Sequence, residues 1–273
     1  MRSSILCFAS LFCTAFAGQH CSAGTLPPIR IILVGDSTMA VGSGYGPGFC
    51  AQVKDEATCL NMAKGGRSTK SYREEGSWAE VTETLHQIAP YTATYVLIQF
   101  GHNDQPNKPG RSTDLATEFP ANMRTYVQEV RAAGAKPVLV TPLTRRMFRD
   151  GKLEDTLGPW AEATRKVAAA ESVPLLDLYR DSSAAIQKLG PTEANTLAMA
   201  TAPPAFAESA RAGTSRPLAP KQPSSTRAES QGDPGPVFDY THLGSKGSLY
   251  FGRMVAAELI STVPELQPYF KQQ

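Results

Sequence analysis

The sequence predicts an α/β protein in which a central parallel sheet lies between two layers of helices, a three-layer α/β/α sandwich. Short apolar runs rich in β-branched residues alternate along the chain with longer stretches of helical periodicity. The apolar runs are continuous rather than alternating with polar residues, which is typical of strands buried on both faces. Such alternation of strands and helices favours a parallel sheet flanked by helices.

The individual elements follow from these runs in chain order. The apolar runs predict strands over residues 31–34, 59–62, 95–100, 137–140 and 173–178. The periodic stretches predict helices over residues 77–88, 115–133, 159–171 and 244–260. Ligands of such folds bind at the carboxyl ends of the strands, so chemically active residues are expected in the loops that follow them.

Length and composition indicate one globular domain over residues 18–273. The chain of 273 residues is 41% hydrophobic and 19% charged, which allows a sizeable core. Within it, residues 199–236 are dominated by Ala, Pro, Ser and Thr. A largely mobile low-complexity insert without helix or strand is expected there, because few apolar side chains can offset its ordering entropy. The formal charge of +2 and the lack of a Lys/Arg run disfavour nucleic acid as a partner.

Residues 1–17 have the pattern of a secretory signal peptide. Arg2 precedes an apolar stretch that ends in Ala15-Phe16-Ala17. This stretch is shorter than the roughly 20 residues of a transmembrane helix, and no later segment reaches that length, so no membrane span is expected. The pattern predicts a secreted protein, in a periplasm or outside the cell.

Cysteine usage leaves two structural alternatives open. Cys7 and Cys13 belong to the predicted signal peptide, and Cys21 would also be lost if cleavage fell slightly later. Cys50 and Cys59 remain, and they either form a disulfide in an oxidising compartment or are two separately buried thiols. No spacing of Cys and His suggests a zinc site.

A candidate nucleophile directly follows the first predicted strand, in Gly35-Asp36-Ser37-Thr38. The small Gly35 allows a tight turn that leaves the hydroxyl of Ser37 exposed at the carboxyl end of the strand. The alternative is that Ser37 only caps the following helix.

A serine needs a neighbouring base, and His242 is the candidate. The spacing Asp239-x-x-His242 allows the carboxylate to accept from one ring nitrogen while the other faces the serine. Such a pair also often caps a helix. His86 lies within a helical pattern, where a packed or solvated role is expected, and His102 directly follows the third predicted strand.

Two further loops offer donors for a developing oxyanion. Gly66, after the second strand, offers a backbone N–H group, and Asn103, after the third, offers its side-chain amide. The alternatives are a plain turn for the glycine and a loop-stabilising role for Asn103.

Several other polar and aromatic residues have ordinary structural interpretations beside functional ones. The acids Asp104 and Asp177 are expected to orient loops at strand ends. The tryptophans are expected to pack within their helices. Three arginines either contact an acidic sugar or are solvated at the surface, namely Arg67, Arg145 and Arg146.

Taken in order, these motifs resemble the GDSL/SGNH hydrolase superfamily, and within it the rhamnogalacturonan acetylesterase branch. The resemblance rests on GDST, NMAKGGRSTKSY, VLIQFGHNDQ, PVLVTPLTRR and DYTH, over about residues 28–190 and 237–262. It implies a flavodoxin-like sandwich, a nucleophile at Ser37 and a dyad of Asp239 and His242. It also implies oxyanion donors at the backbone of Ser37, at Gly66 and at the amide of Asn103. Thr38 stands where the superfamily name has Leu.

The resemblance implies a secreted serine esterase without a cofactor. The substrate class that it implies is an acetylated plant cell-wall polysaccharide or oligosaccharide, with pectic rhamnogalacturonan first. A xylan deacetylase or a general short-chain carboxylesterase is the alternative, because the chemistry is the same. A noncatalytic carbohydrate-binding protein is disfavoured, because binding alone does not require a nucleophile, a base and oxyanion donors together.

Overall fold

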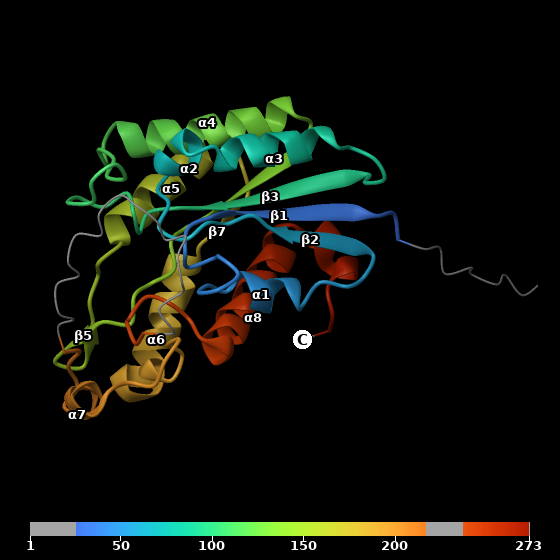
Figure 1. Ribbon diagram of the computed structural model, residues 1–273. Helices are drawn as coiled ribbons and strands as arrows, with labels where there is room; N and C mark the ends of the chain where they lie inside the picture. The colour runs from blue at the N-terminus through green and yellow to red at the C-terminus, as the bar shows by residue number, and fades with distance from the viewer. Residues whose placement is uncertain (1–25, 217–236, 273) are drawn as a thin grey trace, which may run out of the picture.

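The computed structural model describes residues 26–216 and 237–272, and its centre is a five-stranded parallel sheet (Figure 1). The strands in spatial order are β2 (Ala57–Asn61), β1 (Ile29–Gly35), β3 (Ala93–Gln99), β4 (Lys136–Val140) and β7 (Leu175–Leu176). This is the flavodoxin-like order of a doubly wound sheet. The predicted fold class is confirmed.

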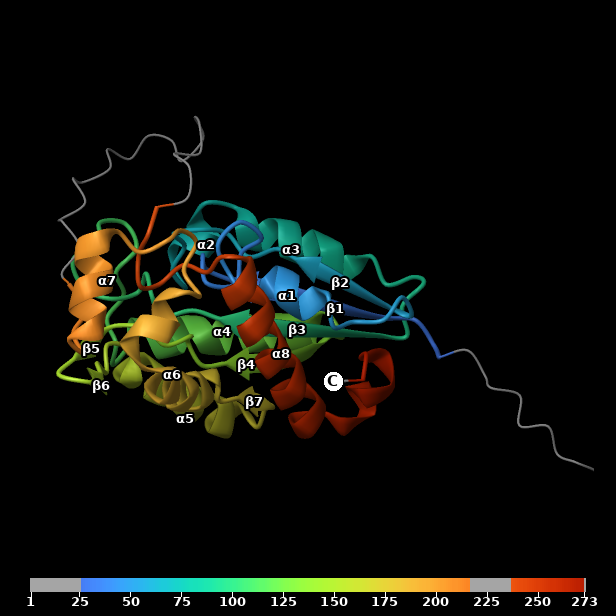
Figure 2. The same ribbon diagram turned by 90° about the horizontal axis from the view of Figure 1, so that it is seen from below.

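Helices cover both faces of the sheet. One face carries α3 (Ser77–His86), α4 (Glu118–Ala132) and α5 (Gly158–Glu171), with the short α2 (Ser71–Glu74) beside them. The other carries α1 (Gly46–Cys50), α6 (Leu178–Asn195) and α8 (Ser245–Thr262), and Figure 2 shows α8 alongside α1. Alternate residues of β1 enter separate apolar clusters on the two faces, Ile31 and Leu33 on one and Ile32 and Val34 on the other. The continuous apolar run therefore reflects burial on both sides.

The last predicted strand is shorter than expected. Only Leu175–Leu176 pairs with β4, and Leu178 already begins α6, which the sequence did not predict. Gly190 interrupts α6 with φ of 73°, and Pro191 follows it. This break obscures the helical period in the sequence, because both residues are typical of helix ends. The structure also contains a hairpin of β5 (Phe148–Arg149) and β6 (Lys152–Leu153) and the 3₁₀ helix η1 (Pro264–Tyr269).

The expectation of an unstructured insert is wrong for residues 199–216. This part contains α7 (Pro204–Arg211), which lies beside β5 in both ribbon views (Figures 1 and 2). The ring of Phe206 on α7 packs 5.4 Å from Phe238 and 6.3 Å from Tyr240, between ring centroids. Phe206 is the one large apolar residue of α7, and its ring thus anchors this helix. The rest of the predicted insert and the predicted signal peptide lie outside the described residues.

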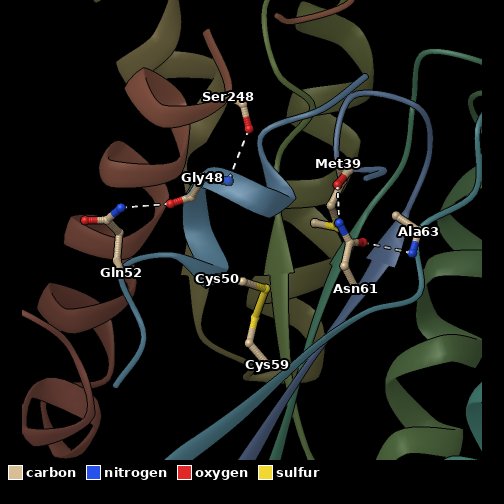
Figure 3. The surroundings of a disulfide bond; sticks show 8 residues. All are labelled: Met39, Gly48, Cys50, Gln52, Cys59, Asn61, Ala63 and Ser248. Carbon is tan, nitrogen blue, oxygen red and sulfur yellow. Dashed lines mark hydrogen bonds between the residues drawn. A yellow bond between two sulfur atoms is a disulfide. The ribbon is translucent and has the colours of Figure 1, made fainter. Parts of the chain in front are cut away.

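Cys50 and Cys59 form a disulfide, which settles the alternative that the sequence left open (Figure 3). The bond joins the end of α1 to β2. Nearby, the backbone N–H of Gly48 on α1 donates to Ser248 Oγ on α8 at 3.1 Å. A Cβ at Gly252 would overlap the backbone of Gly48, so glycine is required where α1 crosses α8. The short α1 is therefore fixed on both sides.

Within residues 26–216 and 237–272, no helix has both the length and the apolar character needed to cross a membrane.

Glu258 on α8 is a buried acid without hydrogen-bond partners. Both its carboxyl oxygens are inaccessible and unpaired among the described residues. Burial, with smaller contributions from nearby Asp181 and Asp177, raises the pKa of this carboxyl to about 8, against an opposing effect of Arg180. The folded protein therefore holds Glu258 protonated at neutral pH.

We expect Glu258→Gln to be more stable than the parent protein, by a margin that grows from about pH 4.5 to about pH 8. In this window the unfolded chain has lost the Glu258 proton and the folded chain still holds it. Titration of the Glu258 carboxyl therefore lowers the stability of the parent protein as the pH rises, and the variant lacks this effect. Thermal unfolding of both proteins from pH 4 to 9 measures the margin. Parallel Tm profiles would show that the carboxyl is already ionised in the fold.

Candidate active site

Ser37 lies in the turn directly after β1, and close strand packing shapes this turn. Gly35 ends the strand, and a Cβ there would lie 2.6 Å from the carbonyl oxygen of Gln99 on β3. Only glycine allows this approach. The buried carboxylate of Asp36 then accepts hydrogen bonds from the backbone N–H and the hydroxyl of Thr38, at 2.8 and 2.7 Å. These contacts fix Ser37 at the carboxyl edge of the sheet.

Asp239 and His242 precede α8 and reach the same edge from the far end of the chain. His242 Nε2 lies 2.8 Å from Ser37 Oγ, and His242 Nδ1 lies 2.6 Å from Asp239 Oδ2. Asp239 Oδ1 accepts from the backbone N–H groups of His242 and Thr241, at 2.7 and 2.8 Å. Burial alone would raise the pKa of Asp239, but these hydrogen bonds hold it well below its usual range. Asp239 is therefore ionised at neutral pH.

Arg146 holds the segment that carries this pair. The residue is 1% exposed, and its guanidinium donates to the carbonyl oxygens of Asp239 and His242 at 2.9 Å each and of Thr241 at 3.2 Å. Burial lowers the pKa of Arg146 to about 10, against the opposing effect of Asp239, so it stays charged at neutral pH. The two interpretations from the sequence, a sugar contact or a solvated residue, are both wrong, because three carbonyl groups converge on this side chain.

Gly66 and Asn103 lie in the loops after β2 and β3. Gly66 has a left-handed conformation, with φ of 76°, which favours glycine. A Cβ at the preceding Gly65 would lie 3.9 Å from the Cβ of Ser37, so this loop passes beside the serine. Asn103 Nδ2 donates to the carbonyl oxygen of Arg67 at 3.0 Å, which ties the two loops together. The structure thus brings the predicted site residues to one edge of the sheet.

Three N–H groups at this edge keep a free hydrogen. Among the described residues, the backbone N–H groups of Ser37 and Gly66 donate to no other group. The amide of Asn103 uses one of its two hydrogens in the contact with Arg67. These groups can therefore donate to an anionic oxygen.

Two buried acids connect the loops around the serine. His102 Nδ1 lies 3.3 Å from Asp36 Oδ2, and burial lowers the pKa of His102, so the imidazole is neutral. Asp104 Oδ1 accepts from the hydroxyls of Thr69 and Thr113, at 2.5 and 3.0 Å. Burial raises the pKa of Asp104 to about 6. Its expected role in orienting loops is confirmed by these contacts.

Three cationic side chains lie near the Asn103 loop without an acidic partner within salt-bridge distance among the described residues. They are Lys108, Arg111 and Arg145. Burial lowers the pKa of Lys108 to about 8, and the positive charges of Arg145 and Arg111 act in the same direction. Asp36 and Asp104 act in the opposite direction. The cluster of three cations still makes this a region of positive charge, which favours an anionic ligand.

The remaining residues singled out from the sequence have structural roles. Trp78 and Trp160 are buried, as expected for packing residues. His86 is exposed at the end of α3, and Asp177 pairs with Arg165 at 2.9 Å. No pattern in the sequence indicated that Arg146 would be buried or that Lys108 would approach Asn103. The only available signal was the position of each cation shortly after a strand.

The geometry combines a hydroxyl, a hydrogen-bonded imidazole, an ionised carboxylate and a group of N–H donors. This combination is able to catalyse acyl transfer through a serine. In the described part of the chain, no group of three or more His, Cys, Asp or Glu side chains is placed to hold a metal ion.

Comparison with known proteins agrees with the fold. The model of the GDSL-like Lipase/Acylhydrolase family matches residues 33–196, which include the serine loop and both donor loops. The chain therefore belongs to this family and is a carboxylic ester hydrolase.

Several of the relatives are named as carbohydrate acetylesterases. The chain is 31% identical over 237 residues to the rhamnogalacturonan acetylesterase RhgT of Bacillus subtilis, covering 84% of this chain and 88% of that protein. It is 30% identical over 177 residues to the probable rhamnogalacturonan acetylesterase YesY of the same organism, covering 62% of this chain and 79% of that protein. The crystal structure of a catalytic mutant of Axe2, an acetylxylan esterase from Geobacillus stearothermophilus, has the same fold. It matches with a TM-score of 0.55 at 14% identity, over 86% of this chain and 96% of that one.

We expect Arg146→Met to lower both the free energy of unfolding and the esterase activity. The substitution leaves three partly buried carbonyl groups without this charged donor, which should cost roughly 2–4 kcal/mol of stability. The loosened segment should also misplace His242. Denaturant unfolding and activity assays measure the two effects. Arg149→Met is the control, because Arg149 is exposed and its side chain, within the described part of the chain, pairs only with Glu154. Unchanged stability of Arg146→Met would contradict the bracing role.

Proposed function

We propose that this chain is a carbohydrate acetylesterase that removes O-acetyl groups through Ser37, His242 and Asp239. The observation that carries the proposal is the continuous contact from Ser37 Oγ to His242 Nε2, at 2.8 Å, and from His242 Nδ1 to Asp239 Oδ2, at 2.6 Å. A hydroxyl, an imidazole and a carboxylate in this order form the catalytic triad of serine hydrolases.

In the proposed reaction, His242 takes the proton of Ser37 Oγ as this oxygen attacks the acetyl carbonyl carbon. The ionised Asp239 orients the ring and stabilises the imidazolium that forms. When the tetrahedral intermediate collapses, the C–O bond to the sugar breaks and His242 gives its proton to the departing sugar oxygen. Water, deprotonated by the same imidazole, then attacks the carbonyl carbon of the acetyl-serine. As this second intermediate collapses, the C–O bond to Ser37 Oγ breaks, His242 returns the proton to Ser37, and acetate leaves.

The developing negative charge on the acyl oxygen requires fixed donors. We assign this role to the backbone N–H of Ser37, the backbone N–H of Gly66 and the side-chain amide of Asn103. The support is that each keeps a hydrogen free of other described residues and that all three belong to loops at one edge of the sheet. Donors fixed before the reaction stabilise the oxyanion without reorganising.

An acidic polysaccharide, with pectic rhamnogalacturonan first, is the proposed substrate. Two relatives carry rhamnogalacturonan acetylesterase in their names. Near the proposed oxyanion donor Asn103, the positive charges of Lys108, Arg111 and Arg145 favour the carboxylates of a uronic acid over an uncharged xylan.

We further propose that the protein acts after export, in a periplasm or outside the cell. The support is the signal-peptide pattern of residues 1–17 together with the disulfide between Cys50 and Cys59. Disulfides persist in oxidising compartments and are rare in the cytosol.

We expect Ser37→Ala to remove nearly all release of acetate and to leave the fold intact. Loss of a triad nucleophile typically lowers kcat by ~10⁶-fold, whereas the hydroxyl contributes little to the turn. Purified variants are assayed on p-nitrophenyl acetate, with circular dichroism to check folding. His86→Ala is the matched control and should keep its activity. Substantial turnover by a folded Ser37→Ala protein would disprove the assignment.

We expect acetate release to be faster from acetylated rhamnogalacturonan fragments than from acetylated xylan. A sharper comparison uses the same pectic fragments after chemical reduction of their carboxyl groups, because each carboxylate is then replaced by an uncharged hydroxymethyl group on the same sugar chain. The kcat/KM should fall on reduction, and added salt should narrow the difference, since salt screens exposed charges. Equal kcat/KM on all three substrates would favour a general short-chain esterase.

A further inference from the structure

Each of the two amide groups assigned as oxyanion donors outside the serine turn has a cationic side chain on its oxygen. Lys108 Nζ lies 3.3 Å from Asn103 Oδ1 and donates to it. Arg67 Nη1 donates to the carbonyl oxygen of Gly65 at 2.6 Å. This carbonyl belongs to the same peptide group as the N–H of Gly66. The two donors are thus backed by cations from two different loops.

We propose that Lys108 and Arg67 are positioning residues of the esterase reaction, which hold and polarise the Asn103 amide and the Gly65–Gly66 peptide as oxyanion donors. The inference rests on the proposed function. Neither cation needs to touch the substrate, because each acts through the amide group that it contacts.

The contacts at Asn103 leave its amide one orientation. Its oxygen faces a group that only donates, the ammonium of Lys108, and its nitrogen faces a group that only accepts, the carbonyl of Arg67. A rotation of the amide by 180° would lose both hydrogen bonds. The second hydrogen of Nδ2 therefore keeps a fixed direction.

A positive charge on an amide oxygen also strengthens the amide as a donor. It draws electron density from the N–H bond, and hydrogen bonds in a chain polarise one another in this way. The benefit grows as the acyl oxygen gains charge, so it is larger in the transition state than in the bound ester. Such an effect appears in kcat more than in KM.

Both cations are held by further contacts. The backbone N–H of Lys108 donates to Ser112 Oγ at 2.8 Å, and this hydroxyl donates to the carbonyl of Gln105 at 2.8 Å, which braces the loop. Arg67 Nε donates to Glu75 Oε2 at 2.8 Å. Arg111 Nη1 donates to the carbonyl of Gly66 at 3.1 Å and fixes the following peptide.

The charge state of Lys108 gives the proposal a pH signature. Burial lowers the pKa of Lys108 to about 8, helped by Arg145 and Arg111 and opposed by Asp36 and Asp104. The side chain loses its charge as the pH rises through this value. Arginine at the same position stays charged over the whole range.

The test compares Lys108→Met, Lys108→Arg and the parent protein on p-nitrophenyl acetate, a neutral ester that needs no carboxylate-binding group. We expect Lys108→Met to lower kcat ~10-fold, less than the ~10²–10³-fold loss typical for removal of a whole oxyanion donor, with little change in KM. Lys108→Arg should restore most of the activity at pH 7. Lys70→Met is the control, because Lys70 pairs with Glu118 and should keep the parental kcat.

The pH profile separates a positioning role from a merely structural one. The kcat of the parent should fall as the pH rises through about 8, and that of Lys108→Arg should not. Glu258 titrates in the same range but is unchanged between the two proteins, so their difference isolates Lys108. A parental kcat in Lys108→Met, or an unchanged alkaline fall in Lys108→Arg, would overturn the proposal for Lys108.

Arg67 is tested with its own matched variant. Arg67→Met should lower kcat ~10-fold on the same ester. Glu75→Gln removes the ion pair between Arg67 and Glu75 but keeps the contact of Arg67 with the carbonyl of Gly65. This variant should change kcat less than twofold. Equal losses in both variants would show that only loop stability matters.

Activity retained by Ser37→Ala would instead remove the proposed function. Loss of activity in Ser37→Ala with parental kcat in both cation variants would reject this inference alone.

Discussion

The site depends first on the parallel pairing of β1 with both of its neighbours. Ile29 is in register with Ala57 of β2 and with Ala93 of β3, so the three strands run level and end at one edge. The loops that follow these three strands therefore meet at this edge. They carry the serine and the two assigned donor groups. The sheet is buried on both faces by apolar clusters, so its strands have little freedom to shift. Packing far from the site thus fixes distances within it.

The histidine and its carboxylate lack this support, because they lie on an irregular segment before α8 rather than after a strand. A buried arginine supplies the missing constraint. Burying a guanidinium is unfavourable unless its hydrogens find acceptors, and Arg146 finds three backbone carbonyls in residues 239–242. The segment is consequently attached to the end of β4 through a side chain. The same contacts place positive charge near the ionised Asp239, which lowers the cost of keeping that carboxylate away from water.

Sequence patterns predicted the parts of this protein that are local and missed those that depend on distant contacts. The first four strands were found because buried parallel strands are continuous apolar runs. Ser37, Gly66 and Asn103 could be picked out because each follows such a run within a few residues, and the Asp239-x-x-His242 pair because its spacing is short. Helix α6 was missed because Gly190 and Pro191 break its period. The packing of α7 rests on Phe206 meeting rings 32 and 34 residues away in the sequence, Phe238 and Tyr240. The roles of Arg146 and Lys108 likewise depend on the burial of Arg146 and on the approach of Lys108 to Asn103, which composition does not encode.

The cations near Ser37 offset the negative charge of the buried Asp36. Asp36, beside the serine, is buried and ionised: burial works against this, but the hydrogen bonds from Thr38 help to hold its pKa below the usual range. A fixed negative charge so close would oppose the second negative charge that the proposed reaction creates. Neutral His102 cannot offset it by charge, and the Thr38 hydrogen bonds do so only in part. Lys108 and Arg145 can, since both interact favourably with Asp36. An acid that shapes the nucleophile turn is therefore tolerated because the Asn103 loop and the segment after β4 bring cations to the same edge of the sheet.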